Sequence, residues 1–469
     1  MSAPQAQEKV LSTLNQDGTR FKIRPRPAKG RFWVRRAIVG YGLIALFVAL
    51  PLIRIGGKPG MLLDLGRREF VLLGASFRPS DGFMLMLFGL TIVLTVFLIT
   101  ALFGRAWCGW GCPQTVYLEF VFRPIERLLE GNPSEIRRRD KDGIDGRRVL
   151  KWAIYLVLAF LLANVFLSYF VGTERLYRWI STSPAKHPFG FGVVVFVTGM
   201  MFFDFAWFRE QTCIVACPYG RLQSVLLDKQ SLIVGYDSKR GEPRGKPGKK
   251  LPVLQDAPAA ATHGACIDCK ACVQVCPTGI DIRDGLQMEC VSCTQCIDAC
   301  DEIMDKVGQP RGLIRYTSQD ELAGVGRHML RARTMIYPTI LAAVFGLLVY
   351  SLGHRTPVEV TVLRQTGAPF QMLADGRVST SIRIKLENRT DATRVYRVTL
   401  DGEPADALVT PQPEVTIKAG AAQVVPLFIM SDGKAFTRGK RKAHVSVRDD
   451  LGTHRTVTLT LLGPEGDRS

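Results

Sequence analysis

Eight of the twelve cysteines form two consecutive runs with the same spacing, and this spacing restricts the fold more than any other feature of the chain. The runs are Cys266-x2-Cys269-x2-Cys272-x3-Cys276, followed by Pro277, and Cys290-x2-Cys293-x2-Cys296-x3-Cys300. A doubled run of this kind holds the two [4Fe–4S] clusters of bacterial ferredoxins. Thiolates suit iron–sulfur clusters because they are soft, charged donors. The chain is therefore expected to transfer single electrons.

In ferredoxins with this spacing, the fourth cysteine of each run crosses to the cluster of the other run. The sequence therefore predicts one cluster bound by Cys266, Cys269, Cys272 and Cys300, and a second bound by Cys290, Cys293, Cys296 and Cys276. Zinc is the alternative metal for Cys-x2-Cys pairs, but two complete four-cysteine runs disfavour it. Asp301 stands where the first run has a proline, and its charge and solvent exposure are expected to alter the potential of the cluster bound by Cys300.

The other four cysteines form two shorter motifs, each at the end of a long apolar stretch. They are Cys108-x3-Cys112-Pro113 and Cys213-x3-Cys217-Pro218. Because proline favours the first position of a helix, Cys112 and Cys217 are predicted to be N-caps, where a helix N-terminus stabilises thiolate. Four thiolates at one depth would hold a soft metal such as Cu(I), or a further cluster. The alternative is four small buried residues at helix packing surfaces, which the repetition of the pair disfavours.

Five apolar stretches are long enough to cross a membrane as helices. They are Ala37–Ile53, Gly82–Phe103, Trp152–Val171, Phe189–Phe208 and Met335–Gly353. The first is expected to be retained as a span rather than cleaved as a signal peptide, because no small-residue cleavage site follows it. The fourth contains Asp204, which is either a functional intramembrane acid or a hydrated one near the interface.

Lysine and arginine in the loops predict the orientation of these spans. The 36 N-terminal residues carry nine of them and Gly104–Lys151 carries ten, whereas Arg54–Asp81 carries five and Gly172–Pro188 carries three. The N-terminus and the ferredoxin segment, which follows the fourth span, are therefore predicted to be cytoplasmic, with the C-terminus on the other side. Clustered thiols suit a reducing compartment, which favours the same orientation.

These features divide the chain into a basic N-terminus (1–36), a four-span membrane domain (37–208), a linker with a ferredoxin-type domain (209–334), a fifth span (335–353) and a C-terminal domain (356–469). The membrane domain has the pattern of a duplicated unit, in which two spans precede each Cys-x3-Cys-Pro motif. Residues 238–262 are rich in proline, glycine and lysine and are predicted to be a linker. The segment from Cys266 to Lys306 contains eight acidic residues and three basic residues. This acidic ferredoxin either docks on the basic membrane face or presents a solvated surface.

After Thr356 the sequence changes to short alternating runs separated by turn residues. The predicted strands are Val358–Leu363, Ser381–Leu386, Tyr396–Leu400, Glu414–Ile417, Gln423–Ile429, Ala443–Val447 and Thr456–Leu461. Seven such strands predict an immunoglobulin-like β-sandwich. The predicted fold class is thus a multi-domain membrane protein: a five-span helical bundle, a cytoplasmic ferredoxin-type domain and a C-terminal sandwich.

The net charge of +19 could indicate nucleic-acid binding, but its distribution argues against that. Basic residues crowd beside the spans, and no nucleic-acid-binding motif accompanies them. Six of the nine basic residues that precede the first span lie close to it: Arg24, Arg26, Lys29, Arg31, Arg35 and Arg36. Attraction to anionic membrane lipid explains this pattern, so lipid is the expected partner and nucleic acid is not.

Taken together, the motifs resemble one known family. Cys-Gly-Trp-Gly-Cys-Pro-Gln-Thr at 108–115, Cys-Ile-Val-Ala-Cys-Pro-Tyr-Gly-Arg at 213–221 and the run from Cys266 to Arg283 are similar to the cytochrome c oxidase accessory proteins known as CcoG, FixG or RdxA. The likeness covers almost the whole chain. It implies that the aspartate at position 301 is shared by the family.

The resemblance implies a multi-pass inner-membrane protein of a Gram-negative bacterium, with a periplasmic C-terminal domain. It also implies assistance in assembling a cbb-type oxidase, by reduction of Cu(II) to Cu(I) at Cys108, Cys112, Cys213 and Cys217. The implied partners are that oxidase or its copper chaperones, and an unidentified cytoplasmic electron donor. Two alternatives stay open: a quinol dehydrogenase-type membrane subunit, and a non-catalytic assembly scaffold.

Overall fold

The computed structural model describes residues 23–464, except 67–68, 78–80, 144, 246–263, 327–331, 365–367 and 391. The chain forms two compact units, Met1–Leu348 and Val349–Ser469. The first contains the cysteines and most of the helical structure, the second contains the β-sandwich, and the helix Ala332–Gly353 crosses the boundary. Each unit is described below by itself.

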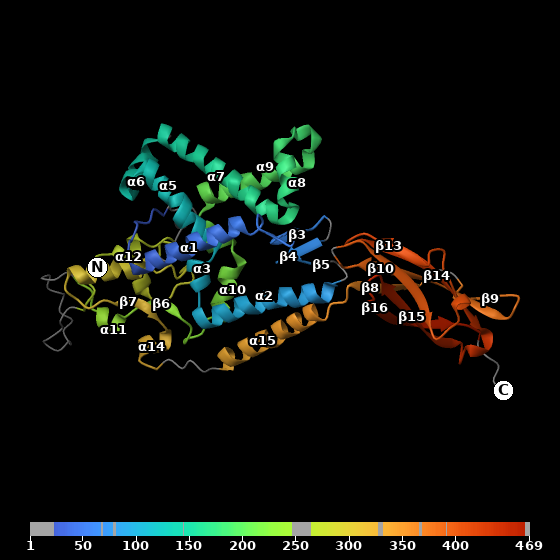
Figure 1. Ribbon diagram of the computed structural model, residues 1–469. Helices are drawn as coiled ribbons and strands as arrows, with labels where there is room; N and C mark the ends of the chain where they lie inside the picture. The colour runs from blue at the N-terminus through green and yellow to red at the C-terminus, as the bar shows by residue number, and fades with distance from the viewer. Residues whose placement is uncertain are drawn as a thin grey trace. The chain divides into compact units, whose positions relative to one another are not determined.

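Five helices in the described chain are long and apolar enough to span a membrane, as predicted. They are α1 (Arg31–Ala49), α2 (Gly82–Phe103), α7 (Gly146–Val171), α9 (Pro188–Phe203) with its π-helical continuation η4 (Asp204–Phe208), and α15 (Ala332–Gly353) (Figure 1). Their apolar side chains are largely exposed in the isolated chain, as expected of surfaces that face lipid. The chain is therefore a multi-pass membrane protein by length and composition of its helices.

Helices α1 and α7 each begin six residues earlier than hydropathy alone predicted, because polar residues cap them. The carboxylate of Asp298 accepts hydrogen bonds from the backbone N–H groups of Phe32 (3.1 Å) and Trp33 (2.7 Å), so α1 begins at Arg31 rather than Ala37. Helix α7 begins at Gly146 because Asp145 accepts from the N–H of Arg148 at 2.9 Å. Such caps satisfy N–H groups that have no partner within the helix.

Shorter elements connect the spans. They are β1 (Arg54–Ile55), β2 (Lys58–Pro59), β3 (Met61–Asp64), β4 (Glu69–Leu72), β5 (Ala75–Phe77), α3 (Ala106–Trp110), α4 (Pro113–Tyr117), η2 (Leu118–Phe122), α5 (Arg123–Glu130), α6 (Pro133–Asp142), α8 (Thr173–Ser181), η3 (Pro184–Lys186), η5 (Thr212–Ala216) and α10 (Pro218–Leu226). Strands β3, β4 and β5 form a small antiparallel sheet between α1 and α2, which the sequence did not predict.

The duplicated unit is visible in the backbone. In each copy a span is followed by a short helix, then an extended cysteine, then a new helix that begins with proline. Cys112 (φ −66°, ψ 125°) is the N-cap of α4, and Cys217 (φ −75°, ψ 110°) is the N-cap of α10. The predicted helix starts at Pro113 and Pro218 are therefore confirmed. The copies differ in the helix before the second cysteine, which is α-helical in α3 and π-helical in η5.

The ferredoxin-type segment is closed by a two-stranded antiparallel sheet of β6 (Ile233–Tyr236) and β7 (Ile314–Thr317). Between these strands lie α11 (Ser238–Gly241), α12 (Ala271–Gln274), η6 (Ile282–Asp284) and α13 (Gln295–Lys306), and α14 (Gln319–Ala323) follows β7. Buried apolar residues such as Ile297 and Leu313 pack with the cysteines in one core. Of the predicted linker, residues 246–262 lie outside the described residues.

The C-terminal unit is a two-sheet sandwich with nine described strands. They are β8 (Val358–Arg364), β9 (Gln371–Met372), β10 (Arg377–Asn388), β11 (Arg394–Asp401), β12 (Leu408–Val409), β13 (Glu414–Ile417), β14 (Ala422–Asp432), β15 (Lys440–Asp449) and β16 (His454–Leu462). One sheet has the order β12–β14–β10–β8, with β9 on β10, and the other β13–β11–β15–β16. All seven predicted strands are present, and β9 and β12 are additional. Alternate residues of the strands meet in one core around Ile384, Tyr396 and Leu427.

Candidate functional site

The eight cysteines of the two long runs lie in two groups, and each group contains a cysteine from the other run. Burial, together with the nearby charges of Cys272, Cys269 and Cys266, raises the pKa of the Cys300 thiol to about 12. Cys300 therefore lies within electrostatic range of three thiols of the first run. This is the grouping that the crossed ligand pattern requires.

The second group surrounds a small cavity. Cys276, the last cysteine of the first run, lines this cavity with Cys290, Cys293 and Cys296, and Cys272 also contributes to the wall. Thr278, Ile280 and Ile282 complete part of the lining and keep it largely apolar. The structure thus brings Cys276 to the thiols of the second run, while the assignment of individual ligands stays a prediction.

Both runs repeat an unusual backbone conformation around their second cysteine. The residues before and after Cys269 are Asp268 (φ 52°) and Lys270 (φ 56°), and those around Cys293 are Ser292 (φ 52°) and Thr294 (φ 62°). Positive φ costs about 1–2 kcal/mol for a residue that is not glycine. Four such residues at equivalent positions indicate that the ligand loops impose this shape. This conformation could not be predicted from the residue types, since none of the four is glycine.

The donor set fits two [4Fe–4S] clusters. Within the described part of the chain, no three Cys, His, Asp or Glu side chains converge on one point, as the ligands of a single metal ion would. A cubane does not need such convergence, because each thiolate binds a separate iron atom. Burial raises the pKa of Cys272 and of Cys293 to about 12. These thiols are neutral without metal, so cluster binding releases protons.

The burial of Asp301 differs from what the sequence predicted. Its expected effect depended on solvent exposure, but the residue is buried. Its carboxylate accepts a hydrogen bond from the N–H of Gly312 at 3.0 Å and pairs with Arg31 at 3.2 Å. With Asp298 capping α1, two of the eight acids bind the start of the first span. The ferredoxin segment therefore docks on α1 through named carboxylates, and the solvated-surface alternative does not hold for these two.

The structure also brings together the four cysteines of the two Cys-x3-Cys-Pro motifs. All four are half-buried. Burial raises the pKa of Cys213, and the charges of Cys112, Cys108 and Cys217 act in the same direction, so the four thiols lie within electrostatic range. Cys108 donates from its Sγ to Oε1 of Gln223 at 3.2 Å, and burial is the main reason its pKa rises to about 12. Among the described residues, these four thiols do not converge on one point as the ligands of a single ion would.

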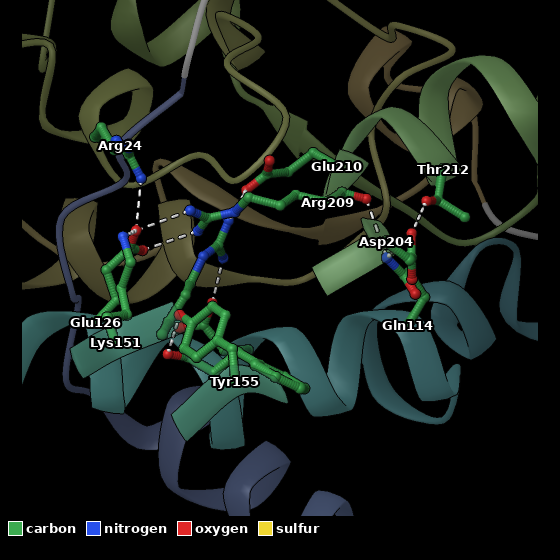
Figure 2. Close-up of polar contacts among 12 residues, drawn as sticks. Arg24, Gln114, Glu126, Lys151, Tyr155, Asp204, Arg209, Glu210 and Thr212 are labelled. Carbon is green, nitrogen blue, oxygen red and sulfur yellow. Dashed lines mark hydrogen bonds and ion pairs between the residues drawn. The ribbon is translucent and has the colours of Figure 1, made fainter. Parts of the chain in front are cut away.

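Asp204 links the two thiol motifs (Figure 2). Its Oδ1 accepts hydrogen bonds from the hydroxyl of Thr212, which precedes Cys213, and from Nε2 of Gln114 (3.2 Å), which follows Cys112 by two residues. The same Gln114 amide donates to the carbonyl of Arg209 at 3.0 Å. Asp204 is thus hydrogen-bonded to a residue beside each of the two motifs. The sequence analysis identified this acid as a candidate, but its hydrogen-bond partners could not be predicted from the sequence.

A buried ion-pair network lies next to this link, and the sequence analysis missed it (Figure 2). Arg209 donates to both oxygens of Glu126, at 2.9 and 3.0 Å, and Arg24 donates to the same carboxylate at 2.6 Å. Lys151 approaches Glu126 at 3.6 Å and Glu130 at 2.8 Å. Burial alone would raise the pKa of Glu126, but Arg209, Arg24 and Lys151 hold it well below its usual range. The network joins α5, α7 and the end of the fourth span.

Two π-helices accompany these polar contacts. Helix η4 carries Asp204 at its start, and η5 carries Cys213. Between them Arg209 has a positive φ of 54°. π-Helical turns are rare and frequent at functional sites. No residue pattern in the sequence marks them.

Known domain families match three parts of the chain. A family described as "4Fe-4S dicluster domain" matches residues 208–319, and "4Fe-4S binding domain" matches residues 85–132. A family described as "IG-like fold at C-terminal of FixG, putative oxidoreductase" matches residues 348–464. The chain therefore contains 4Fe–4S binding domains and an immunoglobulin-like C-terminal domain, as predicted.

Relatives extend over most of the chain. Protein RdxA of Cereibacter sphaeroides is 34% identical over 404 residues, which cover 82% of this chain and 83% of RdxA. Nitrogen fixation protein FixG of Rhizobium meliloti is 34% identical over 430 residues, covering 82% of this chain and 80% of FixG. The putative electron transport protein YccM of Escherichia coli is 21% identical over 58% of this chain and 69% of YccM.

Proposed function

Because the chain belongs to the FixG and RdxA family of membrane iron–sulfur electron-transfer proteins, we propose that it reduces Cu(II) to Cu(I) during assembly of a cbb-type cytochrome c oxidase. One observation carries the proposal. Two thiol pairs that are distant in sequence lie within electrostatic range of one another, beside a domain with eight further cysteines. In the reaction each Cu(II) gains one electron, and the cytoplasmic donor loses one.

The thiols favour the product over the substrate. Soft sulfur ligands select Cu(I), so Cys108, Cys112, Cys213 and Cys217 would stabilise the reduced ion. Cys108 and Cys213 have raised pKa values and must each lose a proton when copper binds. Gln223 then gives up the hydrogen bond it accepts from Cys108. Iron–sulfur clusters on the eight other cysteines would supply the one-electron chemistry.

The proposal also places the protein in the cell. Lysine and arginine counts in the loops support a cytoplasmic ferredoxin segment and a periplasmic sandwich in a bacterial inner membrane. In this orientation the sandwich would meet the oxidase or a copper chaperone, and the electron donor would be cytoplasmic. Fusing a reporter that is active on only one side of the membrane to residue 464 would test the orientation.

A further cluster at Cys108, Cys112, Cys213 and Cys217, called the membrane thiols below because each pair follows a span, is the competing occupant. The family described as "4Fe-4S binding domain" matches residues 85–132, in which Cys108 and Cys112 are the only cysteines. Cys213 and Cys217 would supply the other two ligands. Iron analysis separates the two possibilities, since two clusters need about 8 iron atoms per chain and three need about 12.

Quinol oxidation is the second candidate function, and one cavity favours it. An apolar cavity of about 420 Å³ lies beside the first thiol motif, with Trp107, Gly111, Pro113, Tyr117 and Tyr169 in its lining. Its size and aromatic lining suit a planar organic ring. Turnover with a quinol and an artificial acceptor, without any dependence on copper, would favour this function over copper reduction.

The test is anaerobic Cu(II) reduction by purified, cluster-replete protein. Wild type is compared with Cys108→Ser/Cys112→Ser and with Thr95→Ala, whose hydroxyl donates to the carbonyl oxygen of Thr91 in its own helix. We expect wild type and Thr95→Ala to turn over, and the double variant to keep its eight-cysteine clusters by EPR but lose activity. If wild type reduces no copper while its clusters cycle normally, the copper proposal fails. If a cluster-ligand variant folds and still supports oxidase assembly, the scaffold alternative is favoured.

A further inference from the structure

The first thiol motif packs directly on the loop of the second cysteine run. Gly109 follows Cys108 in α3, and a Cβ atom added at Gly109 would lie 2.7 Å from the carbonyl oxygens of both Val291 and Ser292. Those residues stand between Cys290 and Cys293. Only glycine permits this approach, because real Cβ atoms essentially never come so close to backbone oxygen. The thiol motif and the ligand loop are therefore in backbone contact.

Arg105 fixes the same contact from one side. It is buried, and its Nη1 donates to the carbonyl oxygen of Cys290 at 3.1 Å and to that of Met288. Its carbonyl oxygen also accepts a hydrogen bond from the backbone N–H of Cys108 at 3.1 Å. Arg105 thus contacts both the first thiol motif and the loop of the second cysteine run.

Two further bonds hold the other side. Arg36 of α1 is 1% exposed, and its Nε donates to the carbonyl oxygen of Gly109 at 2.9 Å. Trp110 donates from Nε1 to the hydroxyl of Tyr316 in β7 at 2.9 Å. Helix α3 is therefore held on both sides against the domain that carries the cluster ligands.

The first run offers a contrast within the same domain. Its Cys269 is exposed, although Cys266 and Cys272 are buried like Cys290 and Cys293 of the second run. Cys269 therefore faces solvent, whereas the loop between Cys290 and Cys293 is covered by Gly109 and Arg105.

We infer that Arg105 and Gly109 are positioning residues, which hold the Cys108–Cys112 pair against the Cys290–Cys293 loop and so make the second run the redox neighbour of the membrane thiols. This inference rests on the proposed electron transfer to those thiols for its function, but the contact itself can be tested separately. A purely structural role would stabilise α3 without affecting either thiol group.

The first experiment compares Gly109→Ala with Gly89→Ala. Gly89 lies in α2, and no atom of the described residues lies within 4 Å of a Cβ added there apart from its chain neighbours and its own helix backbone, so its substitution is a matched control. Both proteins are reduced with dithionite and then oxidised with Cu(II), and the clusters are followed by EPR. We expect Gly109→Ala to slow cluster oxidation at least about tenfold, since misplacement by about 1 Å can cost up to 10²-fold. Reduction by dithionite and iron content should not change.

The same two variants are also compared by a measurement that does not depend on copper. Maleimide labelling of the membrane thiols, measured by peptide mass spectrometry, should be faster in Gly109→Ala than in Gly89→Ala, because α3 no longer seals against the loop. Equal labelling and equal oxidation rates in the two variants would overturn the positioning role of Gly109.

Arg105→Gln and Arg105→Lys keep the inference testable if Gly109→Ala does not fold. Loss of the positive charge should lower the midpoint potential of one of the two clusters in an EPR-monitored titration. Lysine should restore most of the shift, since it keeps the charge near Cys290. Equal potentials in wild type and Arg105→Gln would overturn the role of Arg105. If wild type reduces no copper, the proposed function fails, whereas the potential and labelling results still decide the contact.

Discussion

The two kinds of cysteine motif are positioned in different ways. In the ferredoxin-type segment each run supplies three thiols from one short loop, and residues with positive φ on both sides of Cys269 and Cys293 shape these loops. In the membrane segment the two thiol pairs are distant in sequence, and Asp204 joins them through Gln114 and Thr212. Local spacing therefore specifies the first kind of site, and long-range polar contacts specify the second. The variants below should separate these two dependences.

Loss of a cluster ligand should have the largest effect. Cys293→Ser removes a buried thiol from the second group, and iron should fall by about 4 atoms per chain. Metal binding can contribute on the order of 10 kcal/mol to the folding of small metal domains, so the ferredoxin segment should also lose protection from proteolysis. Iron analysis and limited proteolysis measure both effects.

Cys112→Ser is the matched comparison for that variant. If the membrane thiols take copper, Cys112→Ser should leave iron at about 8 atoms per chain; if they hold a third cluster, iron should drop from about 12. Unchanged iron in Cys293→Ser would contradict the assignment of that cysteine as a ligand.

Disruption of the buried ion-pair network should have the second-largest effect. Glu126→Gln leaves Arg209 and Arg24 with an uncharged partner in a buried place, and breaking such a pair costs about 3–5 kcal/mol. The control is Glu302→Gln, whose pair with Lys306 is exposed and should contribute at most about 1 kcal/mol. Thermal unfolding in detergent compares them. A similar melting temperature for the two variants would show that the network does not stabilise this part of the fold.

Asp204 should have a smaller effect on stability and a specific effect on the thiols. Asp204→Ala leaves Gln114 and Thr212 without their shared acceptor, at a cost of about 1–3 kcal/mol. Copper turnover should fall about tenfold because the two motifs lose their link, while iron content stays constant. Asp204→Asn keeps one acceptor oxygen and should retain more activity. Equal loss in both variants would indicate that the charge, rather than the link, matters.

A change to acidic pH should have the smallest of these effects. The pKa of Glu126 is lowered in the folded protein, so its stabilising contribution is fully present above its unfolded pKa of about 4.3 and declines as the pH falls below that value. The melting temperature should therefore not change through Glu126 between about pH 7 and pH 5, and should fall below about pH 4. In Glu126→Gln this component of the acid sensitivity should be absent. A wild-type profile that matches the variant at every pH would contradict the assignment.

Much of this architecture could be predicted because its signals are local. Cysteine spacing indicated the 4Fe–4S domains, continuous apolar stretches indicated five spans, and alternation indicated seven strands from Val358 to Leu461. Proline after cysteine correctly predicted the N-caps Cys112 and Cys217. Each signal depends on neighbours within a few residues, so backbone periodicity and side-chain chemistry were sufficient.

Contacts between distant segments were decided only by the tertiary structure. The sequence could list Glu126, Arg209 and Lys151, but a buried charge is stable only with a partner, and the partners come from different elements. The start of α1 at Arg31 likewise depends on a residue that is distant in sequence, because Asp298 caps this helix. The link at Asp204 and the contact at Gly109 likewise depend on which helices meet. Spacing along the chain determined which chemical groups this protein has, and the tertiary structure determined which of them act together, because close packing and the polar contacts within it bring residues that are far apart in sequence within a few ångströms.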